Sequence, residues 1–206
     1  LQRLSREPRS NHRAIRALIL TPTRELALQV EASLKAYGRH LSLTSTVVMG
    51  GVGMGPQIKA VRRGVDILVA TPGRLLDLMQ QGHVKLDAVQ VFVLDEADRM
   101  LDMGFIHDVR RIASRVPAVR QTLFFSATMP PAVSELAHTL LKNPTRVEVA
   151  PEPIARPKIT QKLMFVDQKD KFGLLISLLH QAAGGRILVF ARTKHRADKI
   201  VKQLSR

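Results

Sequence analysis

Eight short apolar runs, each about the length of a β-strand, recur along the chain and constrain its fold more than any other feature. Most of the runs are apolar throughout instead of alternating, which is typical of parallel strands that are covered on both faces. The runs occupy residues 17–21, 44–49, 66–70, 89–94, 122–126, 145–149, 162–166 and 186–190. Because helical segments separate them, the pattern predicts a doubly wound α/β fold, in which helices flank a parallel sheet.

Apolar residues at helical spacing mark several of the segments between the runs. The spacing predicts a helix over residues 26–37, with Gly38 as its stop signal. A second helix is expected over residues 100–116, and a third is expected to begin at residues 130–131, where two prolines suit a first turn.

A proline-rich stretch at residues 149–160 interrupts this alternation. It lacks a helical period and contains few apolar residues, as interdomain linkers do. An ordinary long loop is the alternative, but a new series of strands and helices follows the stretch. We therefore expect a first domain over residues 1–150, a linker over residues 151–158 and the start of a second domain over residues 159–206.

The charge balance of the chain is strongly basic, with 32 Lys and Arg against 17 acidic residues and a formal net charge of +15. Such an excess favours a polyanionic partner, above all nucleic acid, because neutralised phosphates release counterions. Solubility alone needs a much smaller charge. With one Tyr and seven Phe, the chain is poor in stacking surfaces, so contacts to a nucleic-acid backbone are favoured over base stacking.

The absence of cysteine excludes disulfides and thiolate metal sites and is compatible with a reducing compartment. No apolar run approaches the roughly 20 residues that span a bilayer, and no signal-like core follows Leu1. These features predict a cytoplasmic protein without a membrane partner. Because the sequence starts at Leu1 and not at Met, we expect it to be cut from a longer one.

Polar or glycine-containing clusters follow five of the predicted strands directly. They are Thr21–Glu25, Gly50–Gly51, Thr71–Arg74, Asp95–Asp98 and Ser126–Thr128. Ligands of open parallel sheets bind outside the carboxyl ends of the strands. The sequence therefore predicts one functional edge to which all five clusters contribute.

The acidic cluster after the run at residues 89–94 suits magnesium and nucleotide chemistry. A carboxylate directly after a buried strand is the arrangement that holds Mg²⁺ in phosphate-loop NTPases, and one carboxylate is usually enough. Asp95 is the candidate for the metal, and Glu96 is the candidate to accept a proton from an attacking water. Capping of the following helix is the alternative reading and would by itself account for Asp98.

The clusters Thr21–Glu25 and Thr71–Arg74 share one arrangement, which offers hydroxyls, backbone N–H groups at a helix start and an Arg. These groups can bind phosphodiesters. For either cluster alone, N-capping by Thr with Pro in the first turn explains the residues equally well. Gly50 and Gly51 are compatible with a flexible turn or with close approach of the backbone to a ligand.

Taken in order, these segments resemble the successive motifs of DEAD-box ATP-dependent RNA helicases. The matching segments are PTRELA at 22–27, GG at 50–51, TPGR at 71–74, DEAD at 95–98, SAT at 126–128 and LVF at 188–190. The flanking sequences VLDEADRMLDMGF and LFFSATMP look like the bacterial RhlE-like branch. The resemblance covers essentially the whole chain.

The resemblance implies two RecA-like domains that close over ATP and Mg²⁺ and clamp single-stranded RNA. By this resemblance, Asp95 holds Mg²⁺ through water and Glu96 activates the hydrolytic water. Asp98 bonds to Ser126 and Thr128 and couples hydrolysis to strand separation, and the helix after Arg74 bends the RNA and opens short duplexes locally. The implied contacts to the RNA backbone are Pro22, Thr23, Arg24, Gly50, Gly51, Thr71, Pro72, Gly73 and Arg74, with Arg192 and Thr193 from the second domain.

Several family motifs have no counterpart in these residues. The glutamine-bearing adenine-recognition motif is missing, no Gly-Lys-Ser/Thr sequence occurs, and the arginine-finger motifs are also missing. The resemblance therefore implies an internal piece of a helicase whose first domain lacks its phosphate-loop strand. We expect these 206 residues not to hydrolyse ATP and to be poorly stable, because apolar faces are left open.

Two other functions remain open from the sequence. One is an ATP-independent RNA-binding module that uses the same basic edge, and the other is a DNA-directed relative within helicase superfamily 2. The PTRELA and SAT segments favour RNA, but only through the resemblance. Protein partners are not indicated by any sequence feature.

Overall fold

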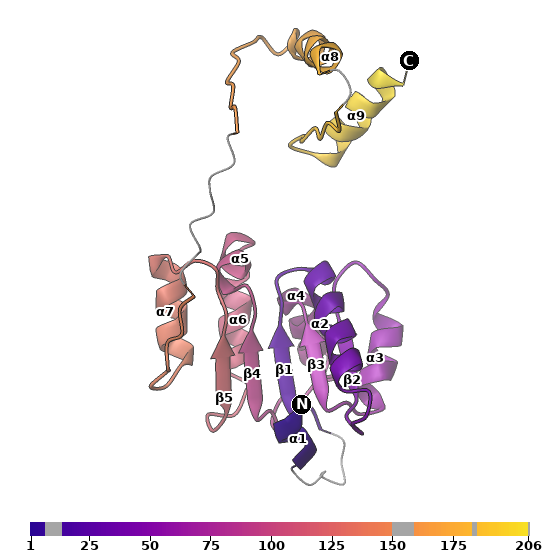
Figure 1. Cartoon of the computed structure of the whole chain (residues 1–206). Helices are drawn as coiled ribbons and strands as arrows, with labels where there is room; N and C mark the ends of the chain where they lie inside the picture. Colours follow the sequence, from indigo (N-terminus) through magenta and orange to yellow (C-terminus); the bar gives the residue numbers. More distant parts are fainter. Residues whose placement is uncertain (7–13, 150–158, 183–184, 206) are drawn as a thin grey trace. The chain divides into compact units, whose positions relative to one another are not determined.

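The computed structural model describes residues 1–6, 14–149, 159–182 and 185–205. The chain divides into two compact units, Leu1–Arg146 and Val147–Arg206, and each is described here by itself (Figure 1). The predicted linker at residues 151–158 lies outside the described residues.

The first unit is built on a five-stranded parallel sheet with the strand order β2-β3-β1-β4-β5 (Figure 1). Its strands are β1 Ala17–Leu20, β2 Ser45–Val48, β3 Ile67–Ala70, β4 Val91–Leu94 and β5 Gln121–Phe124. Every pairing between neighbouring strands is parallel. The first five apolar runs thus form the strands that the sequence predicts, and the predicted α/β class is confirmed.

All five strands end at the same level of the sheet. Leu20, the last residue of β1, lies opposite Ala70 on one side and Leu94 on the other. The same register places Val48 opposite Ala70 and Phe124 opposite Leu94. The segments that follow the strands therefore emerge side by side along one edge.

Seven helices accompany this sheet among the described residues of the first unit. They are α1 Gln2–Arg6, α2 Arg24–Tyr37, α3 Met54–Arg62, α4 Pro72–Gln80, α5 Ala97–Asp102, α6 Ile106–Ala113 and α7 Pro131–Leu140. Helix α2 ends at Tyr37, and the N–H of the following residue, Gly38, donates to the Leu34 carbonyl. The helices predicted to end at Gly38 and to begin at the proline pair are therefore confirmed.

The single helix predicted over residues 100–116 is wrong, because two helices occupy this segment. Helix α5 ends at Asp102 and helix α6 begins at Ile106. Between them Gly104 has a φ of +79°, a left-handed conformation that breaks a right-handed helix and that glycine adopts at little cost. Helix α6 then ends at Ala113, four residues before Pro117.

The main hydrophobic core covers one face of the sheet. It contains Leu18, Leu20, Leu68, Phe92 and Leu94, which are fully buried, and side chains from α4, α6 and α7 pack onto them. A smaller cluster, with Leu4, Ala17 and Ile67, lies on the opposite face under α1 and α2. Because burying a large apolar side chain contributes about 1.5–3 kcal/mol, most of the stability of this unit comes from the larger cluster.

Strand β5 is an edge strand of the sheet, and its side chains are poorly covered. Leu123 is 37% exposed, and Phe125, directly after the strand, is 52% exposed. A row of unpaired backbone groups with exposed apolar side chains is a template for further strand pairing.

The second unit contains helices α8 Lys171–Gln181 and α9 Lys194–Leu204. The strands predicted at residues 145–149, 162–166 and 186–190 are wrong, because none of these described segments is a strand. A strand is stabilised by a hydrogen-bonded neighbour, and no ladder forms among the described residues here. Their apolar side chains remain exposed instead, with Phe165 at 93% and Phe190 at 88%.

No helix within the described part of the chain combines the length and the apolar character needed to cross a bilayer.

Candidate functional site

The five predicted clusters lie at the common edge where the strands end, and the strand order divides them into two halves. Residues 50–53, 71–74 and 21–25 follow β2, β3 and β1, which are neighbours in the sheet. The acidic cluster and the serine–threonine segment follow β4 and β5. The halves meet between β1 and β4. The chain leaves β1 toward β2 on one side of the sheet and leaves β4 toward β5 on the other side. Ligands of open α/β sheets bind at such a switch point.

Glu96 links β4 to α5 through an unusual backbone conformation. Its φ of 53° and ψ of 54° are left-handed, which is uncommon for a residue other than glycine and is frequent at functional sites. The N–H of Asp95 still donates to the Leu20 carbonyl at 3.0 Å, and α5 begins at Ala97. The strand therefore passes into the helix without a loop, which keeps Asp95 and Glu96 at the edge.

Asp98 is joined to the segment after β5 by a closed set of hydrogen bonds. Its Oδ2 accepts from the backbone N–H of Thr128 at 2.9 Å and from the Thr128 hydroxyl at 2.7 Å. The N–H of Asp98 donates to Ser126 Oγ at 3.2 Å, and the Ser126 hydroxyl donates to the Thr128 carbonyl at 2.7 Å. Ser126 therefore contacts the backbone of Asp98, and Thr128 contacts its carboxylate.

These bonds set the charge of Asp98. Burial acts to raise the pKa of its carboxyl group, but the hydrogen bonds from the Thr128 side chain and backbone outweigh it, and the pKa lies below its usual value. Asp98 is thus held as an anion and is fully engaged within the protein.

The pKa of Asp95 is shifted in the opposite direction to that of Asp98. Burial raises the pKa of its carboxyl group, and the nearby charge of Glu96 raises it further, against a weaker opposing hydrogen bond from the Glu96 backbone. A cation beside Asp95 would favour its ionised form. No group of three or more His, Cys, Asp or Glu gathers as a metal site among the residues described. The donor set fits a hard cation that keeps most of its waters and takes one carboxylate from the protein.

On the other half of the edge, two threonines begin helices in different ways. Thr23 caps α2, because its Oγ1 accepts from the Leu26 N–H at 3.2 Å. Thr71 precedes α4 but makes no capping bond with its side chain, and Pro72 takes the first helical position. The capping alternative therefore applies to Thr23 and not to the hydroxyl of Thr71.

The residues predicted to contact RNA differ in their exposure to solvent. Pro22, Thr71 and Pro72 are buried, so they shape the two loops from within. Arg24 and Gly51 are exposed at the surface.

The two glycines after β2 form a turn that an arginine approaches closely. Gly51 has a φ of +76°, and a Cβ at this position would overlap the guanidinium of Arg24. The glycine pair is therefore a turn, and the group that approaches it here is the protein's own Arg24. Close approach of this backbone to a ligand stays a prediction.

Arg74 differs from the free guanidinium fork that the sequence suggests. Its side chain is 12% exposed, and its Nη1 donates to the Val52 carbonyl at 3.0 Å, on the loop after β2. Its Nε lies 3.9 Å from Asp77 Oδ2 and has no hydrogen-bond partner.

Gln57 on α3 was missed by the sequence reasoning, although its side-chain amide bonds to the loop after β2. Its Nε2 donates to the carbonyls of Met49 and Gly53, both at 3.1 Å, and its Oε1 accepts from the Met49 N–H at 2.9 Å. The sequence signal that could have revealed it was a glutamine four residues before Val61, on the same face of the helix as this buried residue.

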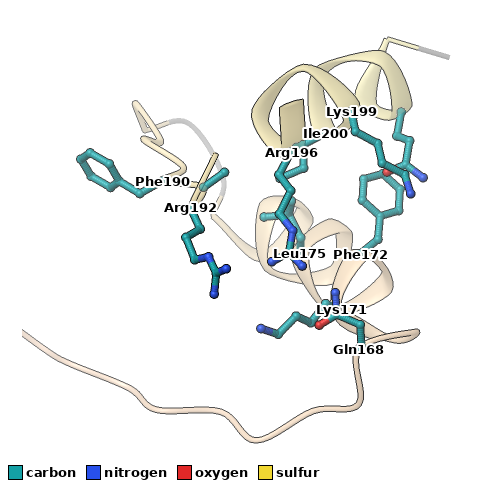
Figure 2. Close-up of a pocket in the computed structure, with 11 residues that line it drawn as sticks. Gln168, Lys171, Phe172, Leu175, Phe190, Arg192, Arg196, Lys199 and Ile200 are labelled. Carbon is teal, nitrogen blue, oxygen red and sulfur yellow. The ribbon is translucent and has the colours of Figure 1, made fainter. Parts of the chain in front are cut away.

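In the second unit, Arg192 and Thr193 lie at the start of α9. Thr193 caps this helix by accepting from the Arg196 N–H at 3.3 Å. Arg192 lines a cavity of about 570 Å³, to which α8 contributes Lys171 and α9 contributes Arg196 and Lys199 (Figure 2). None of these four cations forms an ion pair with another described residue. The cavity is therefore strongly basic.

Residues 1–136, more than half of the chain, match the sequence model of the family described as DEAD/DEAH box helicase. The chain belongs to the DEAD/DEAH box helicase family. The family resemblance of the motifs is thereby confirmed. The RhlE-like branch stays a prediction.

Curated relatives of this DEAD/DEAH box chain carry the names of RNA helicases. The chain is 43% identical to ATP-dependent RNA helicase RhlB of Haemophilus influenzae, over 90% of its own length and 45% of the relative. It is 40% identical to DEAD-box ATP-dependent RNA helicase CshA of Streptococcus pneumoniae, over 95% of its own length and 37% of the relative. It is also 44% identical to DEAD-box ATP-dependent RNA helicase 30 of Oryza sativa, of which it spans 28%.

A solved structure has the same fold as part of this DEAD/DEAH box chain. It is the crystal structure of a hypothetical ATP-dependent RNA helicase from Sulfolobus tokodaii, with a TM-score of 0.59 and 39% sequence identity. The match covers 63% of this chain and 39% of that one. The RecA-like character of the parallel sheet is confirmed by this likeness together with the family match. Like its curated relatives, this structure is much longer than the chain, which spans less than half of each protein compared here.

Proposed function

We propose that this chain is part of an ATP-dependent RNA helicase that clamps single-stranded RNA and locally unwinds short duplexes while it binds and hydrolyses Mg-ATP. The observation that carries the proposal is the division of one sheet edge into two adjacent halves. One half presents carboxylates that suit a metal and a hydrolytic water, and the other presents N–H groups and an arginine that suit phosphates. Because both halves lie on one sheet, binding of Mg-ATP at one half would affect binding of RNA at the other.

In the carboxylate half, Asp95 would hold Mg²⁺ through water, and Glu96 would accept a proton from the attacking water. The metal, when bound, neutralises charge that develops on the transferred phosphoryl group. Asp98 has a separate role, because its carboxylate is already occupied by Thr128. With Ser126 and Thr128 it would transmit a change at the nucleotide to the segment after β5.

In the other half, the RNA backbone would meet Thr23, Arg24, Gly50, Gly51 and Gly73. Backbone N–H groups and a guanidinium recognise phosphates without reading the bases, which agrees with the scarcity of aromatic residues.

The remaining predicted contacts support this surface in different ways. Pro22, Thr71 and Pro72 would set the shape of the loops, because they are buried. From the second unit, Arg192 would contribute a further phosphate contact and Thr193 would hold the start of α9.

The proposal also covers domain organisation and compartment. Residues 1–150 would belong to one RecA-like domain and residues 159–206 to a second, joined by a linker at 151–158. The absence of cysteine and the choice of RNA as partner favour the cytoplasm.

RNA binding by the 206-residue chain tests the proposal directly. We expect single-stranded RNA to bind more tightly than DNA of the same base sequence, measured by filter binding at several salt concentrations. Equal affinity for both would favour a DNA-directed relative. RNA binding that falls steeply with salt would show that the contacts are to the phosphate backbone.

ATP turnover by the same chain is expected to be absent, because no Gly-Lys-Ser/Thr sequence is available to hold the phosphates. Release of phosphate is measured with and without RNA. RNA-stimulated release by these residues alone would contradict this expectation, whereas its absence leaves the RNA-binding half of the proposal intact.

A further inference from the structure

Gln57 is a polar side chain in a buried position. It lies on α3 and is 7% exposed. Burying an amide group without hydrogen bonds is unfavourable, so a buried glutamine is expected to have partners that use its donors and acceptor.

The partners of Gln57 lie at both ends of the short loop between β2 and α3. Its amide makes a paired contact with the N–H and carbonyl of Met49 before the loop and a third bond with the carbonyl of Gly53 after it. Both amide hydrogens and the carbonyl oxygen of Gln57 are thereby used. The side chain closes the loop that contains Gly50, Gly51 and Val52.

Two arginines meet the same loop from other elements. Arg74 donates to the Val52 carbonyl from α4, and Arg24 at the start of α2 lies against Gly51. The carbonyls of Met49, Val52 and Gly53 are therefore engaged within the protein.

The N–H groups of Gly50 and Gly51 bond to no other described residue. The loop consequently has free donors next to a guanidinium while most of its acceptors are occupied. Successive free N–H groups of this kind form a concave surface that suits an anion.

We propose that Gln57 is a positioning residue for RNA binding, because its amide group fixes the loop so that the N–H groups of Gly50 and Gly51 and the guanidinium of Arg24 meet RNA phosphates. The proposal rests on the RNA-binding function proposed above. Gln57 does not touch the RNA, since its side chain is buried and fully engaged. Arg74 has the same kind of role from the other side of the loop.

The test compares Gln57→Met with Thr44→Val in the whole 206-residue chain. Methionine has a length similar to glutamine but makes none of the three bonds. Thr44 provides a matched control, because it lies at the opposite end of β2 and its hydroxyl donates to Asp66 Oδ2 at 3.0 Å. Both substitutions remove side-chain hydrogen bonds with little change in volume, and only the first affects the loop.

The readout is the Kd for a fluorescently labelled single-stranded oligouridylate, measured by anisotropy over a range of salt concentrations. Gln57→Met is expected to raise the Kd at least about tenfold, or about 1.4 kcal/mol, because a hydrogen bond to a charged phosphate is lost. It is also expected to lower the salt slope by about 0.7, because the guanidinium of Arg24 then loses its contact with one phosphate of the single strand. Thr44→Val should change neither quantity, and urea unfolding of both variants shows that they are folded.

An unchanged Kd for Gln57→Met overturns the positioning role while RNA binding stands, and so does a raised Kd with an unchanged salt slope. Failure of the unmodified chain to bind RNA overturns the RNA-binding function and the proposal with it. Hydrogen exchange of the unmodified chain gives an answer that does not depend on how the variant folds. RNA should slow the exchange of the Gly50 and Gly51 amides, and the absence of this protection would also overturn the proposal.

Discussion

At the scale of single residues, two backbone positions with positive φ mark the two halves of the site. Glu96 carries a left-handed backbone between the strand and the helix that hold the carboxylates. Gly51 carries one in the loop that Arg24 approaches. A left-handed conformation costs a residue with a Cβ about 1–2 kcal/mol. Gly51 avoids this cost and Glu96 bears it, which fits a constraint on the position of the Glu96 carboxylate.

Gly51→Ala is expected to destabilise the first unit by about 1–2 kcal/mol, because the added Cβ meets a left-handed backbone and displaces Arg24. Gly55→Ala is the matched control. Gly55 lies in α3 with open space around its Cβ position, so alanine there should be neutral or stabilise by up to about 1 kcal/mol. Urea unfolding measures both, and equal effects would contradict the role assigned to the Gly51 turn.

Hydrogen bonds that join distant residues were the part of the site hardest to predict. The side chains of Gln57 and Arg74 both contact the loop after β2, and neither contact follows from spacing along the sequence. The resemblance did imply the contact between Asp98 and the segment at Ser126, but its division between backbone and carboxylate depends on the exact placement of two strands.

At the scale of elements, the apolar pattern of the sequence predicted strands correctly where a neighbouring strand is present. It predicted them wrongly where no neighbouring strand forms among the described residues. The first five apolar runs pair with one another, whereas the run at residues 186–190 has similar composition and remains unpaired among the described residues. The composition of a segment indicates its preference for the β conformation, but a strand forms only when a neighbouring strand is there to pair with it. The break at Gly104 is likewise decided by one glycine that the apolar period across residues 100–116 concealed.

A buried ion pair connects elements at the end of the sheet opposite to the site. Arg16 Nη2 lies 2.8 Å from Asp66 Oδ1, and both side chains are 8% exposed. Arg16 also donates to the Leu4 carbonyl of α1, while Asp66 Oδ2 accepts from the N–H and hydroxyl of Thr44. Burial acts to raise the pKa of Asp66, but hydrogen bonds from Thr44 and Arg16 and the charge of Arg16 outweigh it, so the pKa lies below its ordinary value.

This ion pair makes the free energy of unfolding of the first unit depend on pH. Because the pKa of Asp66 is lower in the folded state, its contribution is complete above the ordinary Asp value of about 3.9 and is lost as the pH falls through the folded-state pKa. Asp66→Asn should lower the free energy of unfolding at neutral pH by about 3 kcal/mol. It should also flatten the dependence on pH below about 4.

Urea unfolding at a series of pH values measures both effects. Asp87→Asn is the control, because Asp87 is exposed in the segment before β4 and forms no bond with another described residue. An acid dependence that is the same in Asp66→Asn as in the unmodified chain would contradict the role of the buried pair.

At the scale of the whole molecule, charge and exposed apolar surface act in opposite directions. A net charge of +15 opposes self-association. Strand β5 favours it, because Leu123 and the following Phe125 are exposed on an edge with unpaired backbone groups. Exposed side chains of the second unit, such as Phe165, add further apolar surface.

Leu123→Lys is expected to raise by several-fold the highest concentration at which the chain stays monomeric. The reason is that a charge on an edge strand discourages its pairing with a strand of another molecule. Val119→Lys adds the same charge at a position that is 92% exposed and lies before β5, so it should have little effect. Light scattering over a concentration series compares the two. Equal improvement from both would show that net charge, and not the edge, controls association.

The level ends of the strands place the two halves of the site in immediate succession. Asp95 donates its N–H to the carbonyl of Leu20, the next residue is Thr21, and the Thr21 hydroxyl donates to the Thr23 carbonyl. The carboxylate proposed to hold the metal and the threonine cluster proposed to meet RNA are thus separated by one interstrand hydrogen bond and a few atoms of main chain. Under the proposed function, a shift of Asp95 by a fraction of an ångström would therefore displace the segment after β1 through this hydrogen bond, without any rearrangement of the hydrophobic core.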